Sequence, residues 1–254
     1  MEAFFGKKKP EKKEERETLT VSKGEQEIKY PSLDSYLKES LNENLKYHMI
    51  FDNTGHCETF FRYNGNVIDV NKFVLAMSLG KMKKEEAIEK MRKSLVMSMR
   101  MGDRYVINCG KLNVDLKAMF NDSINFPIDM IFDYEEGRKN ANYKKIVRED
   151  EDVDLMGNKK CYWMNENFDI VVLRDISTDN LTNDKREEFK NNIANFTNSF
   201  EYLFVSRENK VGEMSKTPEK NGIGDPLTAA SFINRSKITN AFTFNYGYIY
   251  EPLS

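Results

Sequence analysis

The stretch that decides the fold is Phe168-Asp169-Ile170-Val171-Val172-Leu173. Its centre holds three consecutive β-branched residues and no turn former, which predicts a β-strand. The run does not alternate between apolar and polar residues. Continuous apolar runs of this kind are typical of strands that are buried on both faces, as in a parallel sheet covered by helices.

A helix followed by a strand lies upstream of this run. From about Lys83 to Met101, apolar residues recur every three to four positions while charged residues take the other face, which predicts an amphipathic helix. Gly102 stands where a left-handed residue ends a helix. Tyr105-Val106-Ile107 then predicts a short strand that ends at Asn108. A helix joined by a short loop to a buried strand is the repeating unit of α/β folds.

The same alternation extends in both directions. Two further buried strands are predicted at residues 47–51 and 202–205, and the first ends at the turn signal Asp52-Asn53-Thr54-Gly55. Shorter helices are predicted from residue 33 onward, around 112–120, from Pro127, and after Thr182 or Asn183. We therefore expect an α/β core over residues 31–207, with three layers and with an extended tail at each end.

The two predicted tails differ in chemistry. Residues 1–30 contain a charged run, Lys7 to Glu17, that begins with the cluster Lys7, Lys8 and Lys9. This tail is interpreted either as a solubilising tail or as an arm for an acidic surface. Residues 208–254 lose all periodicity but keep many aromatic residues. This arm either folds over its own core or binds a partner through aromatic anchors. The candidate anchors are Phe232, Phe242, Phe244, Tyr246, Tyr248 and Tyr250.

The composition excludes several classes of protein. The chain has 254 residues and a formal net charge of −2, whereas domains that bind nucleic acid by bulk charge carry a large basic excess. No apolar run approaches the roughly 18 residues of a membrane span, and no signal peptide is recognised. The three cysteines show no disulfide spacing, which favours reduced thiols in the cytoplasm. We therefore expect neither nucleic acid nor membrane as a partner.

The sequence lacks the motifs of several common classes of enzyme. No Gly-Lys pair has a glycine five residues earlier or is followed by Ser or Thr, so the sequence holds no phosphate-binding loop of the usual form. His48 and His56 lack metal-ligand spacing, and they are interpreted as structural, as is Cys57. We expect no cofactor, no metal, no catalytic residues and no enzymatic activity.

Three polar residues remain as weak candidates for a vestigial pocket. Asp52, Asn108 and Asp175 each follow a predicted strand, and ligands of open α/β sheets bind outside the carboxyl ends of the strands. The alternative is that these side chains cap the turns that follow them.

Residues 47–175 resemble a known type of module. The segments that carry the resemblance are Ile50 to Gly55, Thr59 to Tyr63, the helix near 93–101, Gly102 to Asn108 and the strand 169–173. They are similar to a degenerate P-loop/AAA-type α/β module, such as the nucleotide-inactive AAA modules of dynein heavy chains and the C-terminal region of the IQ-motif and ankyrin-repeat-containing protein. The chain has neither IQ motifs nor ankyrin repeats.

The resemblance implies a cytoskeletal setting. We expect a non-enzymatic structural or adaptor protein of a ciliary axoneme or another microtubule assembly, with other proteins of that assembly as partners and tubulin among the candidates. Two alternatives stay open. One is a nucleotide-binding regulator or weak ATPase with a non-standard site, and the other is a cytosolic protein–protein adaptor unrelated to cilia.

Overall fold

The computed structural model describes residues 21, 24–154, 156–177, 182–193 and 198–207. The candidate contacts Lys7, Lys8 and Lys9, and the aromatic residues from Phe232 to Tyr250, lie outside these ranges. None of the described helices is long and apolar enough to cross a membrane.

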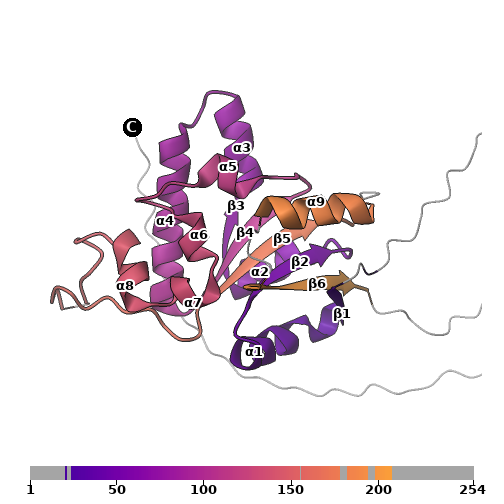
Figure 1. The fold of residues 1–254 in the computed structure, drawn as a ribbon, viewed down its shortest axis with the longest axis horizontal. Coiled ribbons are helices and arrows are strands. Elements are labelled where there is room, and N and C mark those ends of the chain that lie inside the picture. Colours follow the sequence, from indigo (N-terminus) through magenta and orange to yellow (C-terminus); the bar gives the residue numbers. More distant parts are fainter. Residues whose placement is uncertain (1–20, 22–23, 155, 178–181, 194–197, 208–254) are drawn as a thin grey trace, which may run out of the picture. The chain divides into compact units, whose positions relative to one another are not determined.

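The described residues form six parallel strands and the helices that connect them (Figure 1). The order of strands across the sheet is β1-β6-β2-β5-β4-β3. Parallel strands need crossover connections, and each of the five connections contains at least one helix. In chain order the strands are β1 (Glu25–Lys29), β2 (Tyr47–Asp52), β3 (Asn66–Asp69), β4 (Arg104–Gly110), β5 (Asp169–Asp175) and β6 (Phe200–Ser206). The helices are η1 (Tyr30–Ser32), α1 (Leu33–Glu43), α2 (Cys57–Asn64), α3 (Val70–Ser78), α4 (Lys84–Met101), α5 (Leu116–Phe120), α6 (Ile128–Ile131), α7 (Tyr134–Gly137), α8 (Asn140–Tyr143), η2 (Lys144–Ile146) and α9 (Asn183–Ile193).

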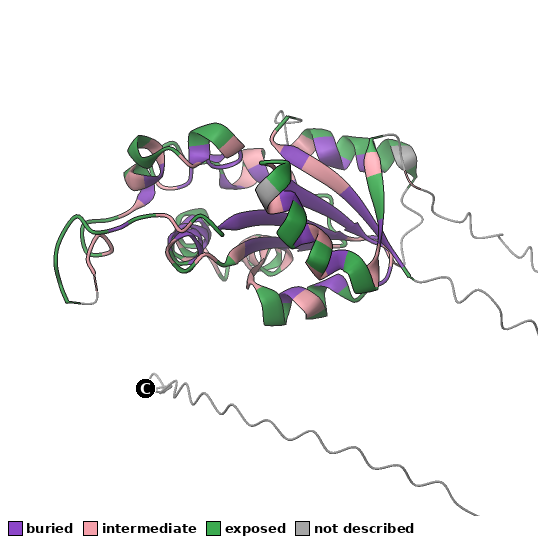
Figure 2. Ribbon diagram, turned by 90° about the horizontal axis from the view of Figure 1, so that it is seen from below, coloured by how far each residue is buried: buried purple, intermediate pink, exposed green. Residues whose placement is uncertain are grey.

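Helices cover both faces of the sheet, which makes a three-layer α/β arrangement. Figure 2 shows buried strands between helices whose outer surfaces are exposed. The connections from β1 to β2 and from β2 to β3 run across the sheet in one direction, and their helices α1 and α2 lie on one face. The connections from β3 to β4, β5 and β6 run in the opposite direction, and their helices α3 to α9 lie on the other face. Because the direction and the face change together, all crossovers share one hand, as right-handed connections require.

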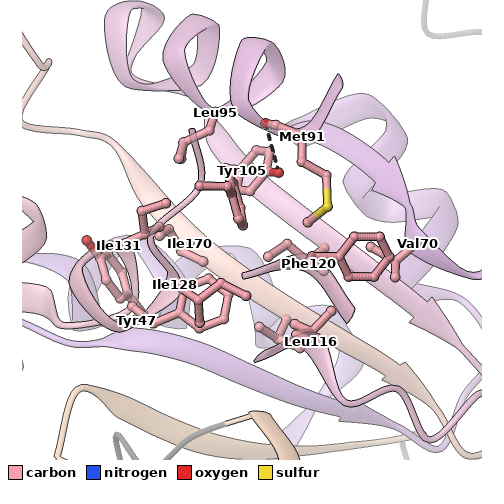
Figure 3. Packing of buried hydrophobic residues seen from close by; sticks show 14 of the residues in the cluster. Tyr47, Val70, Met91, Leu95, Tyr105, Leu116, Phe120, Ile128, Ile131 and Ile170 are labelled. Atoms are coloured by element: carbon pink, nitrogen blue, oxygen red, sulfur yellow. Dashed lines mark hydrogen bonds between the residues drawn. The ribbon is translucent and has the colours of Figure 1, made fainter. Parts of the chain in front are cut away.

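The larger apolar layer lies between the sheet and helices α3 to α9. Tyr105 and Ile170 of the sheet pack there against Met91 and Leu95 of α4 and against Phe120 of α5 (Figure 3). The Tyr105 hydroxyl donates a 3.1 Å hydrogen bond to the carbonyl of Met91, so its polar end is satisfied inside this layer.

The smaller apolar layer lies under α1 and α2. Leu33 and Leu37 of α1 and Phe61 of α2 meet Ile50 and Val171 of the central strands, and all five are buried. The predicted strands at 47–51, 105–107, 169–173 and 202–205 are confirmed, and every residue of β2 is buried.

The sheet begins earlier than the sequence indicates. Strand β1 (Glu25–Lys29) pairs with β6, so the predicted start of the core at residue 31 is too late. The strand escaped recognition because it is a charged edge strand: Ile28 is its single apolar residue and alone joins the apolar core. Helix α2 and the elements β3 and α3 were likewise not assigned from the sequence.

Gly102 ends α4 in the left-handed conformation that the sequence predicts, with φ of +75°. A Cβ there would lie 2.6 Å from the Asn165 side chain. We expect Gly102→Ala to lower the free energy of unfolding by about 1–2 kcal/mol, from the unfavourable backbone conformation, with a further loss from this contact. Gly157→Ala is the matched control, because Gly157 also has a positive φ (+83°) but has nothing within 4 Å of the new Cβ. Urea titrations of the two variants measure these losses. Equal losses of the free energy of unfolding would show that the approach to Asn165 adds no cost at position 102.

Candidate functional site

The three polar residues singled out in the sequence lie together at the carboxyl edge of the sheet. Asp52 ends β2, Asp175 ends β5, and Asn108 lies near the end of β4. These strands are neighbours in the order β2-β5-β4, and Asp52 is directly paired with Asp175. The chain leaves β2 toward α2 on one face and leaves β5 toward α9 on the other. This is where ligands of open α/β sheets bind.

The carboxylate of Asp52 is buried and turns back onto the loop that follows it. Oδ1 accepts hydrogen bonds from the backbone N–H groups of Thr54 (2.8 Å) and Gly55 (3.1 Å) and from the Thr54 hydroxyl (2.6 Å). Oδ2 accepts one from the N–H of Cys57 (2.9 Å), the first residue of α2. Successive N–H groups at the start of a helix form an anion site, and here the chain's own carboxylate fills it.

The loops after β2 and β5 run close to each other. Gly55 adopts φ of +75°, and a Cβ at this position would lie 3.1 Å from the Ser177 hydroxyl. Asp175 Oδ1 in turn accepts hydrogen bonds from the N–H and the hydroxyl of Ser177 (2.8 and 2.7 Å). The Arg207 guanidinium donates to the carbonyl of Thr54 at 3.1 Å. The side chain of Ser177 therefore leaves no free space for a side chain at position 55, and Arg207 ties the loop after β2 to the end of β6.

Asn108 faces the edge strand β3. Its Nδ2 donates to Asp69 Oδ1 at 3.0 Å, and its Oδ1 accepts from the N–H of Gly110 at 3.0 Å. Burial raises the pKa of Asp69, and hydrogen bonds from Lys72, Arg62 and Asn108 lower it by more, so this carboxyl keeps a pKa below its usual value. Asp52, Asn108 and Asp175 thus all carry the hydrogen bonds of turn capping, the alternative that the sequence left open.

The thiols near this edge are poor nucleophiles. Cys57 and Cys109 are both buried. Burial raises the pKa of Cys57 well above its ordinary value, and the neighbouring Asp52 raises it further. Burial raises the pKa of Cys109 to about 12, with a small opposing effect from Arg174. Because the thiolate is the reactive form, neither thiol is suited to covalent catalysis.

We expect one fast-reacting thiol among the described residues. Cys161 is exposed, so it should be modified by a thiol reagent such as a disulfide dye at neutral pH in the native chain. Cys57 and Cys109 should react only as fast as the protein unfolds. A stopped-flow count of modified thiols, with Cys161→Ser as the control, measures this. Rapid modification of the Cys161→Ser variant would contradict the burial of the other two.

A second polar cluster, which the sequence does not reveal, lies at the amino edge of the sheet. His48 of β2 is fully buried; its Nδ1 lies 3.0 Å from Asp169 Oδ2, and its Nε2 lies 3.0 Å from the Ser40 hydroxyl. These distances are those of a Ser–His–Asp triad. The partners are eight and 121 residues away along the chain, so no local spacing signals the cluster.

The hydrogen bonds of Ser40 differ from those of a catalytic triad. The Ser40 hydroxyl donates its single proton to Glu201 Oε2 at 2.7 Å, so this proton is not directed at His48. In a hydrolytic triad the serine donates its proton to the histidine, and the arrangement of Ser40 differs from that.

Glu201 at the start of β6 joins this cluster. Burial raises its pKa, while hydrogen bonds from Tyr36 and Ser40 and the nearby His48 lower it by more, so its pKa lies below the ordinary value of 4.5. A carboxyl whose pKa is lower in the folded than in the unfolded protein stabilises the native state at pH values above its unfolded-state pKa. This stabilisation is lost as the pH falls through the native pKa.

We therefore expect the free energy of unfolding to fall between about pH 5 and pH 3 with a slope to which Glu201 contributes. Glu201→Gln should flatten this part of the curve, because the amide does not titrate. Urea titrations of both proteins across this range provide the comparison. Parallel curves would show that Glu201 is not linked to folding in this way. Glu166→Gln, at an exposed position, is the control.

Two surface hollows of about 330 and 340 Å³ lie away from the carboxyl edge. One is lined by residues of the amino edge, including Lys38, Asn64 and Arg104, and the other by residues of β6 and α9, including Phe200 and Lys190. Neither is lined by Asp52, Asn108 or Asp175. Among the residues that the structure describes, no group of three or more His, Cys, Asp or Glu side chains is arranged to hold a metal ion.

Comparison with protein-family models, with curated proteins and with solved structures gave no match. The function is therefore argued from the residues and their contacts.

Proposed function

We propose that this chain is a non-catalytic adaptor whose α/β core serves as a scaffold for other proteins. The observation that carries the proposal is the Asp52 carboxylate, which fills the anion site at the start of α2 with four hydrogen bonds. A bound phosphate would need the same N–H groups. It would also meet the negative charge of Asp52 at the same place.

The position of this loop connects the proposal with a degenerate P-loop. A phosphate-binding loop joins a strand to a helix, and the loop between β2 and α2 has that place in a central part of the sheet. In an active loop, backbone N–H groups surround phosphate oxygens. Here the backbone N–H groups of Thr54, Gly55 and Cys57 converge on an acidic side chain of the chain itself. This supports the interpretation of residues 47–175 as a degenerate AAA-like module that serves as a scaffold.

The ciliary or microtubule setting is the part of the proposal that rests on that resemblance alone. Expression of the full chain with a fluorescent tag, in ciliated cells, tests it. We expect the tagged chain to remain with the axoneme after detergent extraction. A chain lacking residues 208–254 should be released, if the aromatic arm supplies the adhesion. A diffuse cytosolic signal for the full chain would favour the adaptor unrelated to cilia, and retention of the truncated chain would remove the role of the arm.

The nucleotide-binding regulator is the second candidate. The arrangement of β2, β5 and their loops favours it, because the topology places a crevice there. The filled anion site and the close approach of Ser177 to Gly55 oppose it.

A further inference from the structure

Helix α3 is apolar but poorly buried. Six of its nine residues are Val, Phe, Leu, Ala or Met, yet Val70 is the one that is fully buried. By contrast, the longer and more polar α4 buries eight residues. Leu75 and Leu79, one helical turn apart, are 59% and 58% exposed. An apolar ridge left open in this way costs free energy that a partner would recover on binding.

The chain next to this ridge is basic. Lys81 and Lys83 follow α3 in the turn toward α4, Lys84 is the first residue of α4, and all three are exposed. Lys81 and Lys83 form no ion pair with any other residue that the structure describes. Of the two acidic residues just beyond, Glu86 is already paired with Lys90 at 2.9 Å. Figure 1 shows the α3–α4 hairpin at the upper end of the described core, away from β1 and α1.

We propose that α3 and the turn after it form a docking surface for an acidic amphipathic helix of a partner protein. The surface consists of Leu75, Leu79, Lys81 and Lys83. Leu75 and Leu79 would pack between the apolar side chains of the partner helix, since residues four apart form the ridges that helices use to pack together. Lys81 and Lys83 would face its carboxylates. The inference rests on the proposed function, for which it names one surface and the kind of partner.

Charge complementarity selects this occupant. A second copy of the chain would bring two lysine-rich turns together at a symmetric contact, and like charges repel. An anionic membrane would be attracted by the lysines, but two leucines that are more than half exposed present little surface for insertion compared with an interfacial helix. An acidic amphipathic helix would cover Leu75 and Leu79 with its apolar face and would pair its carboxylates with Lys81 and Lys83.

A titration with synthetic peptides tests the surface on the full chain. The probe is a fluorescently labelled helical peptide with leucines on one face and glutamates on the other. Fluorescence anisotropy should show saturable binding to the wild-type chain. The Leu75→Ser/Leu79→Ser variant and the Lys81→Glu/Lys83→Glu variant should each bind at least about tenfold more weakly, as expected for the loss of roughly 1.4 kcal/mol or more. A peptide of the same composition in scrambled order should not bind.

Matched variants keep the result specific. Ile124→Ser/Trp163→Ser removes two exposed apolar side chains elsewhere, and Lys159→Glu/Lys160→Glu reverses two exposed charges elsewhere; both should bind like the wild type. The proposal is overturned by any of three results: no binding of the acidic peptide, equal binding by the Leu75/Leu79 variant, or a preference for phosphatidylserine vesicles over the peptide. A dimer of the wild-type chain that the Leu75/Leu79 variant lacks would assign the surface to a second copy and also overturn it. None of these results bears on nucleotide binding, which is the separate test of the proposed function.

Discussion

Glu25→Ala should lower the free energy of unfolding by about 3–5 kcal/mol, although Glu25 lies in a charged edge strand. The Glu25 side chain is fully buried between β1 and α9, where it meets Arg186 Nη1 at 2.9 Å and Lys190 Nζ at 3.0 Å. Arg186 also lies over the Phe204 ring, and Lys190 lies over the Phe51 ring. Removal of the carboxylate leaves two buried cations without their shared anion, so α9 should separate from the sheet.

The control for this prediction is Glu27→Ala in the same strand, where the side chain is 42% exposed and pairs with Lys29. We expect it to cost less than about 1 kcal/mol. Urea titrations compare the two variants. A further variant replaces the whole group, with Glu25→Leu, Arg186→Met and Lys190→Met together, and should recover much of the loss because no charge remains buried. A cost for Glu25→Ala as small as that for Glu27→Ala would contradict the account of how α9 is held.

His48→Ala should lower the free energy of unfolding by a similar amount, about 3–5 kcal/mol. His48 is the residue that satisfies Asp169 Oδ2, and Asp169 Oδ1 has no hydrogen-bond partner among the described residues. The variant therefore leaves a buried carboxylate with neither a donor nor a counter-ion. It also leaves a cavity between α1 and the strands β2 and β5. Denaturant titration at neutral pH measures the loss.

His56→Ala is the control, because His56 is exposed, and it should change the stability by no more than about 0.5 kcal/mol. A fluorophosphonate probe separates the structural account from a hydrolase account of the same three residues. We expect no labelling of Ser40 in the native chain, because its proton is held by Glu201. Labelling that disappears in His48→Ala would instead identify a working triad.

The sequence was sufficient to predict the central strands and α4. Runs such as Ile170 to Leu173 are apolar without interruption. In an α/β chain, a short uninterrupted apolar run is typical of a strand that is buried on both faces. It was not sufficient for β1, whose charged residues are stabilised by partners on α9, more than 150 residues away. Local patterns carry no information on such distant pairs.

The candidate site was predictable in position but not in its chemistry. The carboxyl ends of parallel strands meet at one edge, which brings Asp52, Asn108 and Asp175 together. Whether the Asp52 oxygens face a ligand or their own loop depends on the backbone between Asp52 and Cys57. The left-handed Gly55 helps to direct three N–H groups toward the carboxylate. The conformation of this loop decides the outcome, and the sequence pattern does not reveal that conformation.

The central claim is that the anion site after β2 is filled by Asp52, so that the core acts as a scaffold and does not bind nucleotides. Isothermal titration calorimetry of the full chain with ATP, ADP and GTP, each with and without Mg²⁺, tests this claim most directly. We expect no heat of binding with any of the six combinations up to millimolar nucleotide. Micromolar binding of any one of them would contradict the account and would establish the nucleotide-binding regulator in its place.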